Sequence, residues 1–158
     1  MTQSAPPTIT RESPATPDLA LLFERHTADM HADTPPESIH MMDASELDHP
    51  DIAFFVMREG GVPLAMGAFK RINDGHAEIK SMHVLAEARG RGLSRAMLDH
   101  LLAAARAAGF ARLSLETGVQ PTFIAARALY ERAGFDICGP FEGYDEDPNS
   151  LFMTRSLI

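Results

Sequence analysis

The sequence has little of what cross-links a protein or binds metal. Cys138 is the single cysteine among 158 residues, so no internal disulfide can form. A zinc site needs several thiolate or imidazole ligands at short spacing, and the sequence offers no such group. Histidines at positions 26, 31 and 40 are close along the chain, but isolated helical histidines are usually surface or core residues. We therefore expect no metal and a reducing, cytoplasmic location.

Long apolar runs and an excess of positive charge are also missing. No apolar run approaches the roughly 20 residues that cross a bilayer, and the N-terminus lacks the basic region and apolar core of a signal peptide. Fourteen basic against 22 acidic residues give a net charge of −8, which repels nucleic acid. We expect a soluble protein whose partners include neither a membrane nor a nucleic acid.

The chain is expected to form one α/β domain over residues 1–158. This length is enough for a single core, and no repeat, low-complexity block or linker divides it. Prolines at 6 and 7 predict a loose arm over residues 1–7, followed by a short edge strand around Thr8–Arg11. A helix is predicted from Asp18, as its N-cap, to about Met30. Residues 34–50 have no clear pattern, and we expect them to flank the substrate cleft.

The rest of the chain alternates between strand and helix patterns. Three apolar runs separated by turn signals predict an antiparallel meander, the third of which leads directly into a glycine-rich loop. An amphipathic helix follows that loop and ends at Gly109. The predicted strands are 52–57, 64–71, 76–84, 111–116, 135–138 and 150–157, and the later helix covers about 122–133.

The glycine-rich loop is suited to binding phosphate. Gly90 and Gly92 permit backbone angles that let successive N–H groups converge on an anion, and the following helix adds a partial positive charge of about half a unit. Three nearby arginines supply mobile counter-charge for a ligand with several phosphates. No Gly-Lys-Ser/Thr follows the glycines, which excludes a P-loop nucleotide hydrolase. The loop and helix start read Arg89, Gly90, Arg91, Gly92, Leu93, Ser94 and Arg95.

These features together resemble the GNAT family of acetyl-CoA-dependent N-acetyltransferases, over roughly residues 50–158. The strand, the Arg-x-x-Gly-x-small loop formed by Arg89, Gly92 and Ser94, and the later segment 128–135 (Ala-Leu-Tyr-Glu-Arg-Ala-Gly-Phe) carry the resemblance. It implies a mixed, mostly antiparallel, twisted sheet of six to seven strands flanked by helices and splayed in the middle to hold the cofactor. It also implies a possible homodimer.

The resemblance assigns roles to the loop and to the strand before it. The backbone of residues 89–95 would hold the pyrophosphate of coenzyme A, with Ser94 in place of the usual Gly or Ala. Met82, His83 and Val84 would pair with the pantetheine and orient the thioester carbonyl, because fixed N–H donors stabilise the developing oxyanion. Tyr130 occupies the position of the tyrosine that protonates the departing thiolate, although packing alone is the competing interpretation.

The attacking amine must lose a proton, so the site needs a general base. Glu78 is our first candidate, because strand alternation places it on one face with Lys80, Met82 and Val84 before any bulge. An exposed strand residue beside Lys80 is the alternative interpretation of Glu78. His83 and Glu116 are the reserve candidates for the base, and Arg112 could neutralise Glu116.

The predicted reaction is transfer of an acetyl group from acetyl-CoA to a primary amine of a small molecule or peptide, by direct attack in a ternary complex. Cys138 lies in a late strand away from the loop, so no acyl-enzyme is expected. Phe123 stands where the family often has an asparagine that touches the cofactor, and Gln120 or Thr122 could substitute. A non-catalytic module that binds or senses coenzyme A is the alternative function.

Overall fold

A computed structural model describes residues 6–158, so most of the predicted N-terminal arm lies outside the described residues. It contains a seven-stranded sheet in the order β1-β2-β3-β4-β5-β7-β6. Every neighbouring pair is antiparallel except β4 and β5, which are parallel. The predicted fold class, a mixed and mostly antiparallel sheet flanked by helices, is confirmed.

The strands are β1 (Thr8–Arg11), β2 (Ile52–Glu59), β3 (Val62–Asn73), β4 (His76–Val84), β5 (Arg112–Gly118), β6 (Asp136–Cys138) and β7 (Ser150–Ser156). The helices are α1 (Ala20–Asp33), α2 (Ala44–Leu47), α3 (Leu93–Ala107) and α4 (Ile124–Arg132). Short 3-10 turns lie at η1 (Pro17–Leu19), η2 (Pro36–Ser38), η3 (Ala86–Ala88) and η4 (Pro121–Phe123). In residues 6–158 no helix combines the length and the apolar character needed to cross a bilayer.

The start of α1 differs from the prediction. Asp18 does not cap the helix but lies in η1, where its carboxylate accepts hydrogen bonds from Arg58 at 2.6 and 2.9 Å. The N-cap is Leu19, which makes no side-chain capping bond. A charge-assisted pair with a guanidinium competes with capping for the same carboxylate, and here it replaces the cap.

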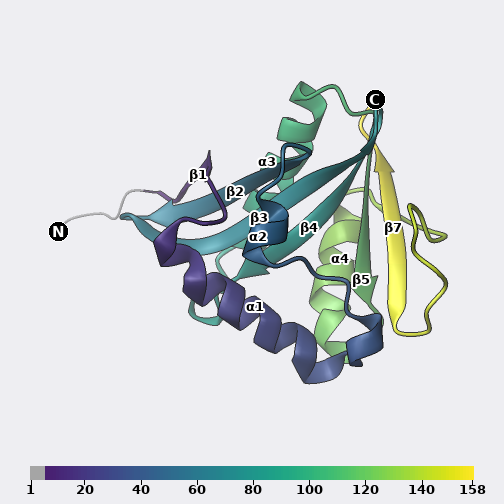
Figure 1. Cartoon of the computed structure of the whole chain (residues 1–158), viewed down its shortest axis with the longest axis horizontal. Helices are drawn as coiled ribbons and strands as arrows, with labels where there is room; N and C mark the ends of the chain where they lie inside the picture. Colours follow the sequence, from purple (N-terminus) through teal and green to yellow (C-terminus); the bar gives the residue numbers. More distant parts are fainter. Residues whose placement is uncertain (1–5) are drawn as a thin grey trace.

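Helices cover both faces of the sheet. In Figure 1, α1 and α2 lie in front of the sheet and α3 lies behind it. The buried face of α3 presents Met97 and Leu101 to β3, where a Cβ on Gly67 would lie 2.9 Å from Met97 Cγ. Gly67 therefore allows α3 to pack closely against the sheet. On the opposite face, α1 buries His26 against His83 of β4.

The sheet opens between its two parallel strands. Pairing of β4 with β5 is confined to His76–Glu78 and Arg112–Ser114, although both strands continue for several residues beyond. Helix α4 contacts both diverging strands, because Arg127 donates to the Gly118 carbonyl of β5 at 2.9 Å and the Tyr130 hydroxyl lies 3.9 Å from Met82 Sδ of β4. The predicted splay in the middle of the sheet is present.

A bulge in β4 changes which side chains share a face. Lys80 pairs with Ala68 and His83 pairs with Met66, so two residues of β4 oppose Gly67. Ser81, at the bulge, has a φ of 57°. The alternation predicted from the sequence is therefore wrong beyond Lys80, because the extra residue moves Val84 to the other face. His83 takes its place on the face of Glu78 and Lys80.

Candidate active site

The loop before α3 presents a row of unpaired backbone donors. Gly90 and Gly92 have φ values of 82° and 76°, conformations that L side chains rarely adopt. Gly92 is the N-cap of α3 and provides no side-chain hydrogen bond. In residues 6–158 the backbone N–H groups from Gly90 to Arg95 donate to no carbonyl and no side chain. These N–H groups, together with the helix N-terminus, form an arrangement that binds anions.

The arginines around this loop were predicted to be mobile counter-charges, but in the structure they are engaged. Each one pairs with a carboxylate, and Arg89 also donates to the Val84 carbonyl at 3.2 Å. About half of each guanidinium side chain is exposed, so each pair contributes little to stability. The pairs are Arg89 with Asp29, Arg91 with Glu59, and Arg95 with Asp99.

Tyr130 lies at the edge of the splay, next to the β4 bulge. Its ring is buried and packs edge-on against Phe135, and its hydroxyl lies 3.9 Å from Met82 Sδ. Burial raises the pKa of Tyr130 to about 12, so the phenol stays protonated and donates a hydrogen bond at neutral pH. At the bulge, the buried Ser81 hydroxyl has no partner among residues 6–158.

His83 faces α1. Its ring lies 5.3 Å from that of His26, and its Nδ1 is 3.9 Å from Asp29. Burial lowers the pKa of His83 and lowers that of His26 to about 4, so both rings are neutral at pH 7. The other nitrogen of His83, Nε2, is buried and has no partner in the described part of the chain.

A polar cavity of about 460 Å³ lies on the α1 and α2 face of the sheet. It is formed by β3, β4, the segment around η2 and the loop between β6 and β7. Acidic side chains outnumber basic ones in its wall, which gives it a negative potential. The ionisable residues that line it are Glu37, His40, Lys70, Arg71, Glu78, Lys80, Glu142, Asp145, Glu146 and Asp147.

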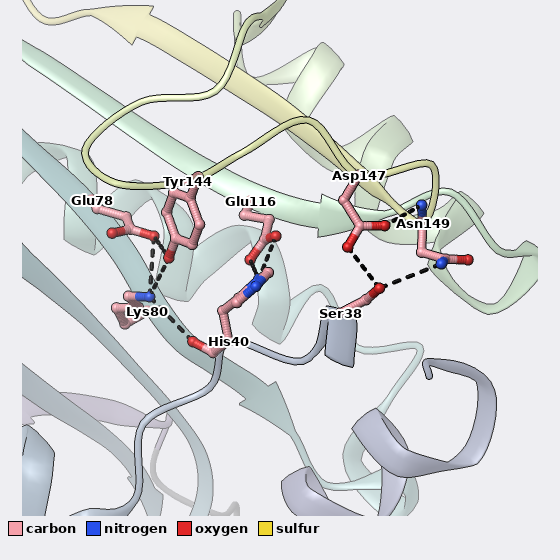
Figure 2. Close-up of polar contacts among 8 residues, drawn as sticks. All are labelled: Ser38, His40, Glu78, Lys80, Glu116, Tyr144, Asp147 and Asn149. Atoms are coloured by element: carbon pink, nitrogen blue, oxygen red, sulfur yellow. Dashed lines mark hydrogen bonds and ion pairs between the residues drawn. The ribbon is translucent and has the colours of Figure 1, made fainter. Parts of the chain in front are cut away.

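Glu78 lies in this cavity, but its carboxylate is already engaged. The Tyr144 hydroxyl donates to Glu78 Oε2 at 2.6 Å, and Lys80 Nζ lies 3.2 Å from the same oxygen (Figure 2). Lys80 also donates to the Tyr144 hydroxyl at 2.6 Å. Burial and the neighbouring carboxylate of Glu78 raise the pKa of Tyr144 well above its usual value, so this phenol remains protonated.

His40 and Glu116 form a second polar pair in the same region. Nδ1 of His40 lies 2.7 and 2.9 Å from the two carboxylate oxygens of Glu116, on β5 (Figure 2). The backbone carbonyl of His40 accepts from Lys80 on β4 at 3.3 Å. Further along, Ser38 donates to Asp147 at 2.7 Å and so ties the η2 turn to the loop between β6 and β7.

Neither His40 nor Tyr144 was predicted from the sequence as a site residue. Both lie in irregular segments, and their partners are distant in sequence, 76 residues away for the pair of His40 with Glu116. Phe123 stands at the position where the family often has asparagine, and its ring packs against Gly118. Of the two suggested substitutes, Thr122 donates to Asp33 at 2.8 Å, whereas the buried Gln120 Oε1 has no partner among residues 6–158.

Comparison with known proteins decides the family. The model of the Acetyltransferase (GNAT) family matches residues 19–135. The chain is a member of the GNAT family. It is 43% identical over 136 residues to the N-acetyltransferase YsnE of Bacillus subtilis, covering 86% of this chain and 90% of that protein. It is also 42% identical over 155 residues to a protein of Azospirillum brasilense named IAA acetyltransferase, covering 95% and 97%.

Solved structures give the same assignment of the fold. A proposed acyl-CoA N-acyltransferase of Klebsiella pneumoniae superimposes with a TM-score of 0.79 at 27% identity, over 96% of this chain and 98% of that one. An acetyltransferase of Streptococcus agalactiae, at 20% identity, gives a TM-score of 0.74 over 95% and 98%. The predicted membership is confirmed, and this GNAT protein is an acyltransferase.

Proposed function

We propose that this GNAT protein transfers the acetyl group of acetyl-CoA to a primary amine of a small molecule or peptide. The observation that carries the proposal is the row of unpaired N–H groups from Gly90 to Arg95, which follows β4, the strand that separates from β5 beyond Glu78. A pyrophosphate needs such a row of donors, and an extended pantetheine arm needs an open strand edge.

The loop and the β4 strand would hold the donor substrate. The N–H groups of residues 90–95 would bind the pyrophosphate, and the guanidinium of Arg89 would exchange Asp29 for a phosphate oxygen. Met82, His83 and Val84 would pair with the pantetheine through the β4 edge that β5 leaves unpaired. Gly90 and Gly92 keep the approach open, because no Cβ stands between the ligand and the backbone.

The reaction would proceed by direct attack in a ternary complex. The amine nitrogen attacks the thioester carbon, and backbone N–H groups near Met82 and His83 stabilise the oxyanion. Tyr130 then protonates the departing thiolate, a role that fits its protonated, buried phenol beside the bulge. Cys138 takes no part, since β7 separates its strand from β5.

The acidic cavity would receive the acceptor. Carboxylates in its wall, among them Glu37, Glu142 and Glu146, attract a protonated amine and disfavour an anion. The acceptor is therefore expected to carry at least one positive charge before reaction. Because one relative is named IAA acetyltransferase, IAA is a comparison compound for the acceptor assay.

The experiment that tests this proposal is a thiol-release assay with acetyl-CoA and a panel of acceptors that includes diamines, amino sugars, peptide N-termini and IAA. We expect release of free coenzyme A with at least one cationic amine, together with saturable binding of acetyl-CoA in calorimetry. Binding without turnover against the whole panel would support a coenzyme A sensing module instead. The absence of any binding heat would refute the proposal.

A further inference from the structure

His40 bridges the two strands that diverge in the middle of the sheet. Its imidazole contacts Glu116 on β5, its backbone carbonyl accepts from Lys80 on β4, and its ring packs edge-on against Tyr144 with centroids 5.2 Å apart. Figure 2 shows His40 lying between Lys80 and Glu116. The segment before α2 therefore crosses the opening of the sheet on the face that carries the cavity, where an acceptor nitrogen would approach a thioester held between β4 and β5.

The contact with Glu116 fixes which nitrogen of His40 is free. A carboxylate has no proton to donate at neutral pH, so Nδ1 of His40 must carry the hydrogen that bridges to it. In its neutral form the ring therefore presents the lone pair of Nε2. Within the described chain, no side chain or carbonyl lies within hydrogen-bonding distance of Nε2. A histidine oriented by a carboxylate with its second nitrogen unoccupied is the arrangement that general-base catalysis uses.

We propose that His40, oriented by Glu116, is the general base that deprotonates the acceptor amine, the role predicted from the sequence for Glu78. The inference rests on the proposed function, because it assigns a proton acceptor to that same acetyl transfer. Glu78, whose carboxylate accepts from Tyr144 and pairs with Lys80, is then a positioning residue that fixes the cavity wall under His40.

Protons and bonds balance in this scheme. Nε2 of neutral His40 takes one proton from the ammonium group, and the freed nitrogen forms a bond to the acetyl carbon. As the second N–H proton leaves, the carbon–sulfur bond breaks, and Tyr130 protonates the thiolate and regains its proton from the nitrogen. His40 releases its proton to solvent. The products are the acetamide, free coenzyme A and one proton.

Charged groups surround His40 on several elements. Glu116 of β5 lies 2.7 Å from its Nδ1, and Asp147 of the loop between β6 and β7 lines the same cavity. Lys80 of β4, which donates to the His40 carbonyl, pairs with Glu78 at 3.2 Å. Glu37, on η2, adds a further carboxylate at the cavity wall. The carboxylates around His40 outnumber the cations, and this net negative charge attracts the ammonium group of the substrate.

His40→Asn is the test variant, because the amide nitrogen of asparagine can still donate to Glu116 while the base is removed. We expect kcat/KM at pH 7 to fall about 100-fold or more, with the Kd of acetyl-CoA unchanged. The loss shrinks to less than about 10-fold near pH 10, where primary amines deprotonate in solution. His49→Asn is the matched control, since His49 also lies beside an aspartate, Asp51, but outside this cavity.

Glu116→Gln keeps an acceptor for Nδ1 but removes the charge. We expect the acidic limb of the kcat/KM profile, present in the wild type, to move to lower pH in this variant and to vanish in His40→Asn. If the wild type is active and His40→Asn keeps its kcat/KM, the inference is overturned while the proposed function stands. The same holds if kcat/KM of His40→Asn falls by the same factor at every pH. A wild type without turnover for any amine overturns the proposed function and the inference with it. A Glu78→Gln variant that loses the acidic limb would return the base role to Glu78.

Discussion

Gly92 is the position where one added methyl group tests the phosphate-binding loop most cleanly. Its φ of 76° lies in the left-handed region, and an added Cβ would meet no atom within 4 Å. Gly92→Ala therefore introduces backbone strain without a clash, at a cost of about 1–2 kcal/mol. For a chain of this size that strain lowers Tm by about 2–8 °C.

The same strain displaces the unpaired backbone N–H groups of the loop. Relaxing φ at Gly92 turns the N–H groups that follow it away from the pyrophosphate. Losing one hydrogen bond to a charged group costs about 1.5–3 kcal/mol, which corresponds to an increase of about 10- to 150-fold in the Kd of acetyl-CoA. Calorimetric titration measures this Kd directly.

Gly61→Ala supplies the control. Gly61 has a φ of 82° with no atom within 4 Å of an added Cβ, but it lies in the turn between β2 and β3. We expect a similar loss of Tm and an unchanged Kd. If Gly92→Ala binds acetyl-CoA as tightly as the wild type, or if both variants weaken binding equally, the assignment of the loop as the pyrophosphate site is refuted.

Two further predictions follow from the buried titratable groups. Tyr130→Phe should lower kcat about 10-fold, because the thiolate then leaves without a proton donor. The Kd of acetyl-CoA should stay within a factor of two, because phenylalanine keeps the packed ring. An unchanged kcat in steady-state assays would show that Tyr130 serves packing alone. The pKa of His26 is about 4 in the folded chain against 6.5 ordinarily, so the stability that its neutral ring contributes is complete above pH 6.5 and is lost as the pH falls toward 4. The free energy of unfolding falls by about 2 kcal/mol at pH 5. Urea denaturation at pH 7 and pH 5 should show this loss in the wild type but not in His26→Gln. An equal loss in both proteins would contradict the attribution of the pH dependence to His26.

The parts of the fold that were predictable from the sequence are those encoded over short distances. The β4 strand, the glycine loop and α3 follow one another with clear periodicity, and the structure places them within a residue or two of the prediction. The bulge at Ser81 carried no such signal, because serine rarely adopts a φ of 57°. Its effect is to put His83, rather than Val84, on the face of Glu78.

The contacts of the acceptor cavity were not predictable for a different reason. His40 and Tyr144 come from irregular segments without periodicity, and Tyr144 meets Glu78 across 66 residues of sequence. Asp18 failed as a helix cap because Arg58, 40 residues away, pairs with its carboxylate. Sequence patterns report on residues that are close along the chain, whereas the contacts of these side chains depend on the tertiary structure.

Backbone amide resonances of residues 90–95, followed in ¹⁵N-labelled protein during titration with coenzyme A, test the central claim most directly. We predict that these amides shift and saturate with the same Kd that calorimetry gives, because their hydrogens bind the pyrophosphate. Saturable binding that moves other resonances and leaves those of Gly90 to Arg95 in place would contradict the account.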